Sequence, residues 1–78
     1  MDENDKQIFY HKISTKLTDL KNLADTHPFA CLAEGIDRKE IDLWILYVGA
    51  TINPDNDALT RIMNDANIVY AKLKKYQS

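Results

Sequence analysis

The residues best suited to chemistry are His27 and Cys31, which stand four positions apart. If Pro28 opens a helical turn, the imidazole and the thiol share a helix face, where they could bind a metal ion or form an activated thiolate. Zinc sites need three or four protein ligands, and the only other histidine, His11, falls in a different predicted helix. Cys31 is the only cysteine and has apolar neighbours, which is typical of a small buried side chain. We therefore expect neither a metal site nor a catalytic thiol.

Two groups of acidic residues could also do chemistry. The first, Asp55-Asn56-Asp57, has the spacing that begins a calcium loop, but Ala66 stands where such a loop carries its bidentate glutamate. The second consists of Asp37, Glu40 and Asp42 at the start of a predicted helix, where capping and the helix dipole explain them. The two glycines are too far apart for a phosphate-binding loop. We expect a protein that is not an enzyme and that needs no cofactor.

Length and composition indicate one small domain. Its 78 residues predict a single helical domain over 1–78, with residues 1–4 disordered. Ten Lys and Arg against twelve Asp and Glu give a net charge of −2, which argues against nucleic-acid binding. A single cysteine and an acidic N-terminus, unlike a signal peptide, favour the cytoplasm. The longest apolar stretch, 43–52, is about half of the ~20 residues that a membrane helix needs, so we expect no membrane contact.

Helical periodicity predicts an all-α fold. The three main helices are expected near 5–25, 37–51 and 54–76, with a short extra helical turn near 28–34 that reads as an apolar plug. They would form a small three-helix bundle or an open helical hairpin. We expect the two long helices to pack antiparallel or in an open hairpin, with the middle helix inserted between them.

Capping residues mark the ends of these segments. Asp37 is a good N-cap, and Glu40 follows three residues later as in a capping box. Asn53 could cap the last helix, with Pro54 at its first position. Gly35 is suited to end the short turn in a left-handed conformation.

The middle helix is apolar on two faces. One face carries Ile41, Trp44, Ile45, Val48 and Ile52, and the other carries Leu43, Leu46, Tyr47 and Ala50. A short bundle cannot easily bury both faces internally. Because Trp and Tyr are enriched at binding hot spots, we expect Trp44 or Tyr47 at an interface.

The last helix has an apolar seam at heptad spacing. Its members are Leu59, Ile62, Ala66, Val69, Leu73 and Tyr76. At 1.5 Å per residue the middle helix spans about 22 Å and the last helix about 35 Å, so the middle helix cannot cover the whole seam. Either the first helix covers the remainder, or Tyr70, Leu73 and Tyr76 face a partner; we favour the second alternative.

These patterns together predict a non-enzymatic protein-binding module of accessory, chaperone-like, inhibitor or immunity type. An apolar helix face would bind a protein partner or a second copy, in a homodimer or hetero-complex. The expected partner-binding residues are Trp44, Tyr47, Tyr70, Leu73 and Tyr76. The alternative is a dimeric nucleic-acid-associated regulator that uses the lysines of the first helix, namely Lys12, Lys16 and Lys21.

Overall fold

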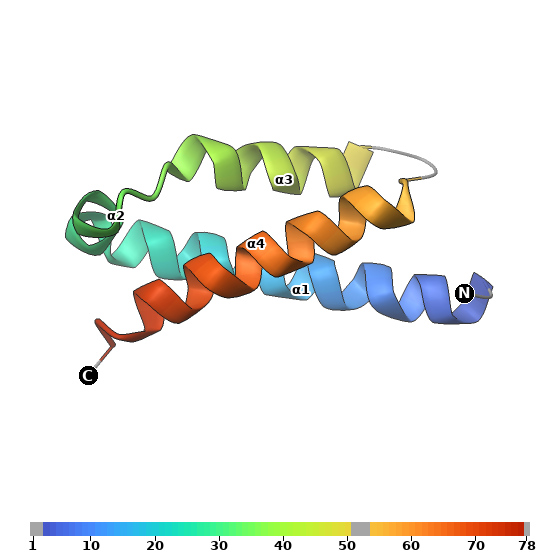
Figure 1. Ribbon diagram of the computed structural model, residues 1–78, viewed down its shortest axis with the longest axis horizontal. Helices are drawn as coiled ribbons and strands as arrows, with labels where there is room; N and C mark the ends of the chain where they lie inside the picture. The colour runs from blue at the N-terminus through green and yellow to red at the C-terminus, as the bar shows by residue number, and fades with distance from the viewer. Residues whose placement is uncertain (1–2, 51–53, 78) are drawn as a thin grey trace.

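Four α-helices account for nearly all of residues 3–50 and 54–77, which are the residues that the computed structural model describes (Figure 1). In chain order they are α1 (Glu3–Thr26), α2 (Pro28–Glu34), α3 (Arg38–Ala50) and α4 (Asn56–Lys74). The predicted all-α bundle with a short extra helix is therefore confirmed. Because α1 begins at Glu3, the predicted disorder does not include residues 3 and 4, and residues 1 and 2 lie outside the described residues.

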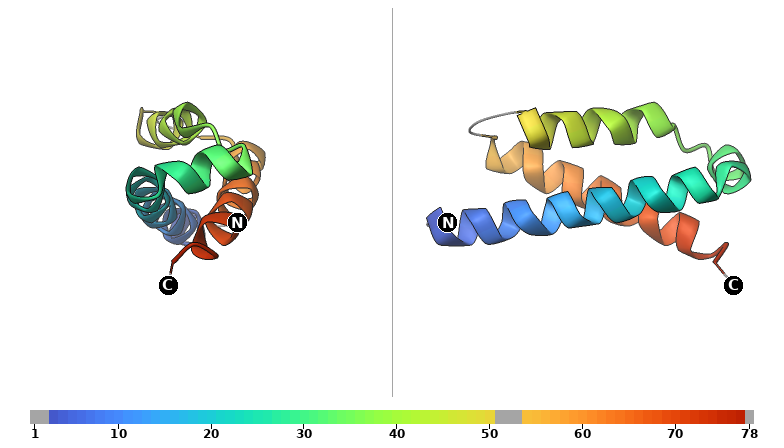
Figure 2. Two further views of the ribbon diagram at one scale, coloured as in Figure 1. Left: turned by 90° about the vertical axis from the view of Figure 1, so that its left-hand side faces the viewer. Right: turned by 180° about the vertical axis from the view of Figure 1, so that it is seen from behind.

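The helices are arranged around α1, which packs against both α3 and α4 in a molecule about 40 Å long. α3 runs back along α1, and α4 then reverses again, so α1 and α4 run in the same direction and cross (Figure 1). Since α3 and α4 touch each other little, α3 is not inserted between the long helices. The predicted antiparallel arrangement of the long helices is wrong, because the chain reverses its direction twice between them. α2 lies across one end of the bundle (Figure 2).

The core is built from the inward faces of all four helices. Apolar residues of α1 at three- and four-residue spacing and most of the predicted seam of α4 are buried there. The buried apolar residues are Ile13, Leu17, Leu20, Leu23, Ala24, Ala30, Cys31, Ile41, Val48, Leu59, Ile62, Ala66 and Leu73. Among the described residues the core contains no buried polar or charged side chain, so apolar packing stabilises the fold.

The connection from α2 to α3 follows the predicted signals. Gly35 adopts a left-handed backbone conformation with φ of 69°, and its N–H donates to the carbonyl of Leu32 at 3.3 Å. The carboxylate of Asp37 accepts a hydrogen bond from the backbone N–H of Lys39 at 3.0 Å, as expected of an N-cap. Gly35 therefore ends α2, and Asp37 starts α3, as predicted.

The start of α4 differs from the prediction. Asp55 is the N-cap: its backbone is extended, with ψ of 132°, and its carboxylate accepts from the backbone N–H of Asp57 at 3.3 Å. Pro54 therefore precedes the cap instead of occupying the first helical position. The predicted cap, Asn53, lies outside the described residues. The helix starts later because Asp55 supplies a capping carboxylate that reaches the first turn.

Candidate protein-binding surface

Leu73 does not face a partner: its side chain is completely buried. α1 packs along α4, and α2 contacts the C-terminal end of α4. The predicted exposure of Leu73 is thus wrong, because α1 and α2 cover the part of the seam that α3 cannot reach.

Tyr70 is half-buried where α1 meets α4. The ammonium group of Lys16 lies 4.3 Å from the centre of its ring, and that of Lys74 lies 5.4 Å away. Lys74 Nζ also donates to the Tyr70 hydroxyl at 3.5 Å. Cation–π attraction from both helices therefore holds this ring in place within the molecule.

Tyr76 is the most exposed of the five predicted residues, at 45% of its surface. Its hydroxyl donates to Glu34 Oε1 of α2 at 3.1 Å, and Lys75 Nζ lies 3.2 Å from the same oxygen. The hydrogen bonds from Lys75 and Tyr76 lower the pKa of the Glu34 carboxyl, and the bond to Glu34 raises the pKa of Tyr76. This α2 clasp, formed by Glu34, Lys75 and Tyr76, joins α2 to the chain end that follows α4.

Trp44 and Tyr47 are half-buried and pack against the core. The hydroxyl of Tyr47 accepts from the backbone N–H of Asp55 at 3.4 Å, at the start of α4. From α1, the hydroxyl of Tyr10 donates to the carbonyl of Val48. These two tyrosines therefore position the end of α3 and the start of α4.

The large apolar side chains that lie open to solvent on α2 and α3 are not those predicted. On α2, Phe29 and Leu32 are 84% and 81% exposed; we call them the α2 surface. On α3, Leu43 and Leu46 are 63% and 62% exposed. A helix of seven residues has one inward side, which Ala30 and Cys31 occupy, so α2 is not the predicted apolar plug. For α3, the sequence feature that indicated exposed apolar side chains was the presence of two apolar faces on one helix. The face with Leu43 and Leu46 is the one exposed to solvent.

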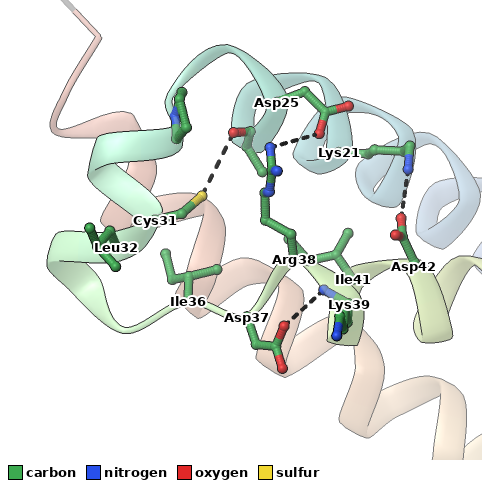
Figure 3. A pocket seen from close by; sticks show the side chains of 12 residues that line it. Lys21, Asp25, Cys31, Leu32, Ile36, Asp37, Arg38, Lys39, Ile41 and Asp42 are labelled. Carbon is green, nitrogen blue, oxygen red and sulfur yellow. Dashed lines mark hydrogen bonds and ion pairs between the residues drawn. The ribbon is translucent and has the colours of Figure 1, made fainter.

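A groove of about 440 Å³ adjoins the α2 surface, between α1, α2 and α3 (Figure 3). Leu32 and Pro28 line it from α2. The remaining apolar lining residues are Ala24, Cys31, Ile36 and Ile41, and the charged ones are Lys21, Asp25, Asp37, Arg38, Lys39 and Asp42. The groove therefore combines an apolar surface with charges of both signs.

Two ion pairs between α1 and α3 line the groove (Figure 3). Lys21 Nζ lies 2.6 Å from Asp42 Oδ1, and Arg38 Nη1 lies 3.5 Å from Asp25 Oδ1. The hydrogen bond to Asp42 raises the pKa of Lys21. These pairs are exposed and contribute little stability, but they set the positions of charges around the apolar lining.

His27 and Cys31 are both bonded to the backbone at the end of α1. His27 Nδ1 lies 2.9 Å from the carbonyl oxygen of Leu23, and the Cys31 thiol donates to the carbonyl of Ala24 at 3.7 Å. Burial raises the pKa of the Cys31 thiol, which lowers the fraction present as the reactive thiolate. Within residues 3–50 and 54–77, no three His, Cys, Asp or Glu side chains are grouped so that they could hold a metal ion.

Comparisons of the chain with protein-family models, with curated proteins and with solved structures found no significant match. In the described part of the chain, no helix is long and apolar enough to cross a membrane. The functional interpretation therefore depends on the geometry of the α2 surface and its groove.

Proposed function

We propose that the chain is a non-enzymatic protein-binding module of accessory, chaperone-like, inhibitor or immunity type. Its α2 surface and the adjoining groove bind an apolar segment of a protein partner. The observation that carries the proposal is the exposure of Phe29 and Leu32, each more than four-fifths open to solvent on a helix of seven residues. Single exposed apolar side chains are common on proteins, but two on one short helix beside a partly apolar groove are typical of a contact site.

The groove indicates what the partner presents. Its volume, about 440 Å³, suits one or two large side chains rather than a whole helix. The charges of the groove are of both signs and are largely paired with each other. A strongly charged ligand would therefore gain little binding free energy from them. We therefore propose that the partner inserts an apolar side chain, flanked by polar residues, between Leu32 and Ile36.

The α2 surface is held ready for binding. The left-handed Gly35 ends α2 at one side, and the α2 clasp joins Glu34 to the chain end after α4. Side chains on an element that is already ordered lose less conformational entropy when a partner binds. Tyr76 is bonded to α2 through Glu34, whereas Leu73 lies in the core.

The alternative function, a dimeric nucleic-acid-associated regulator, has weaker support. Of the three lysines of α1 that it needs, Lys21 is paired with Asp42 on the α3 side, while Lys16 lies on the Tyr70 ring on the α4 side. They do not form one stripe along which phosphates could be neutralised. Strong binding to DNA that falls steeply with salt in a mobility-shift assay would favour this alternative over our proposal.

We also propose that the module acts in the cytoplasm, because its one cysteine is a free, buried thiol. A chain without disulfides suits a reducing compartment. Non-enzymatic action is part of the same proposal, since His27 and Cys31 are engaged with backbone carbonyl groups.

The test is cross-linking in cells of the source organism, with a photoreactive amino acid at position 32. The captured partner is then purified, and its affinity is measured by calorimetry for the wild type and for Phe29→Ser/Leu32→Ser. We expect the double variant to bind at least about tenfold more weakly, because hot-spot side chains contribute more than about 1–2 kcal/mol each.

The matched control is Ile8→Ser/Ile68→Ser, which removes two exposed apolar side chains that belong neither to the α2 surface nor to the groove. It should bind as the wild type does, and circular dichroism should show unchanged helix content for both double variants. Equal binding by the α2 variant and the wild type would refute the proposal.

A further inference from the structure

A second apolar surface lies on the outer side of α3. Leu43 and Leu46 are three residues apart and therefore share one face of the helix. Lys39 and Ala50 are exposed on the same face, four residues before and after the leucines. We call these four residues the α3 stripe. Ile41 and Val48 on the opposite face are buried, so Leu43 and Leu46 lie on the side of α3 that faces away from the core.

The charges of α3 are all in its first half. They are Arg38, Lys39, Glu40 and Asp42, and residues 43–50 carry none. Arg38 and Asp42 are paired with α1. Lys39 is exposed on the stripe near the start of the helix, where the helix dipole disfavours a cation. Lys39 is therefore the charged residue of the stripe, and it lies at the end of the helix that favours a cation less.

We propose that the α3 stripe binds the α3 stripe of a second copy in antiparallel orientation. A twofold axis passes midway between Leu43 and Leu46. Leu43 of each copy then contacts Leu46 of the other copy, so the same contact forms twice. Lys39 then meets Ala50 of the second copy, at the carboxyl end of that helix, where the dipole favours a cation.

The charge of Lys39 disfavours the parallel alternative. Parallel α3 helices in contact along the stripe would place Lys39 on Lys39 of the second copy, and like charges in contact are destabilising. In the antiparallel pair, the charged first half of each helix faces the uncharged second half of the other. Ala50, the stripe residue in that second half that meets Lys39, is small, which lets the two helices approach closely there.

The size of the α3 stripe sets the expected affinity of the dimer. One pair of helices of 13 residues each buries less than the ~1,200 Å² in total that stable interfaces need, so the dimer is weak and depends on concentration. The inference does not rest on the proposed function: the α3 stripe shares no residue with the α2 surface and only Lys39 with the adjoining groove.

Sedimentation velocity over about 10 µM to 1 mM tests the dimer, a range that brackets the weak affinities expected of small interfaces. The wild type should shift from monomer to dimer as its concentration rises. Leu43→Gln/Leu46→Gln should remain monomeric throughout with unchanged helix content, because both side chains are exposed in the monomer. Phe29→Ser/Leu32→Ser is the matched control and should dimerise as the wild type does.

Disulfide trapping tests the orientation, in a Cys31→Ala background that removes the native thiol. Chains with Lys39→Cys should cross-link to chains with Ala50→Cys, and neither variant should cross-link efficiently to itself. Efficient 39–39 linkage would overturn the antiparallel pairing.

A wild type that stays monomeric to about 1 mM would overturn the inference and leave the proposed function standing. Loss of the dimer in the Phe29→Ser/Leu32→Ser control, with the Leu43→Gln/Leu46→Gln variant still dimeric, would also overturn it. That result would make the second copy the occupant of the α2 surface.

Discussion

At the residue scale, α4 shows that the position of an apolar side chain, and not its type, decides its role. Leu73 and Ile68 are both large and apolar, and they are five residues apart on one helix. Leu73 is completely buried, whereas Ile68 is 55% exposed on the polar side of α4. Their contributions to stability should differ accordingly.

Substitution of each residue by alanine measures this difference. Leu73→Ala should lower the free energy of unfolding by about 2–5 kcal/mol, because it leaves a cavity in the core. Ile68→Ala should change it by less than about 0.5 kcal/mol, as is usual at exposed sites. Urea denaturation followed by circular dichroism gives both values. Similar values for the two variants would mean that the C-terminal half of α4 is not packed as described.

At the scale of the elements, the two glycines have opposite roles. Gly35 ends α2 with φ of 69°, a conformation that side chains with a Cβ rarely adopt. Gly49 lies inside α3 with ordinary helical geometry, and a Cβ placed there would meet no atom within 4 Å. Glycine is required by the backbone at position 35 and is only a weak helix former at position 49.

Alanine at these positions should therefore act in opposite directions. Gly35→Ala should destabilise the chain by about 1 kcal/mol or more, because the left-handed conformation strains alanine. Gly49→Ala should stabilise the monomer by about 0.5–1 kcal/mol through its better helix propensity. Thermal unfolding of dilute samples, where the monomer dominates, checks both. A loss of stability in Gly49→Ala would contradict the open surroundings of that residue.

At the scale of the whole molecule, the α2 clasp joins parts that are distant in the sequence. Glu34 is bonded to Tyr76, 42 positions later, and to Lys75. α2 packs little against the other helices, so this clasp helps to fix the α2 surface relative to the rest of the bundle. Its strength should depend on pH through Glu34.

The expected pH dependence follows from the lowered pKa of Glu34 in the folded chain. The clasp stabilises the fold above the unfolded pKa of a glutamate, about 4.3, and this contribution is lost as the pH falls through the lower folded pKa. Glu34→Gln should therefore be less stable than the wild type at pH 7, and the difference should shrink below about pH 4. Melting temperatures of both proteins from pH 7 to pH 3 measure it. A difference that stays constant with pH would show that the charge of Glu34 does not contribute.

The sequence alone determined the helices and, for α1 and α4, most of the face that turns inward. The inward face of α1, the seam of α4 up to Leu73 and the caps Gly35 and Asp37 were all predictable, because helix formation depends on residues three or four positions apart and on the residues at the helix ends. The predicted start of α4, at Pro54, is two residues earlier than the observed start at Asn56. The prediction was early because proline and aspartate both favour the start of a helix.

Only the tertiary structure decided which of these residues reach the surface. Leu73 and Leu43 have equally apolar side chains, yet α1 and α2 cover the first and no described helix covers the second. α3 could turn either of its two apolar faces inward, and the direction of α4 depends on the reversals before it. Burial is set by contacts between distant segments, which local periodicity does not encode. The exposed α2 surface and α3 stripe are therefore properties of the assembled fold.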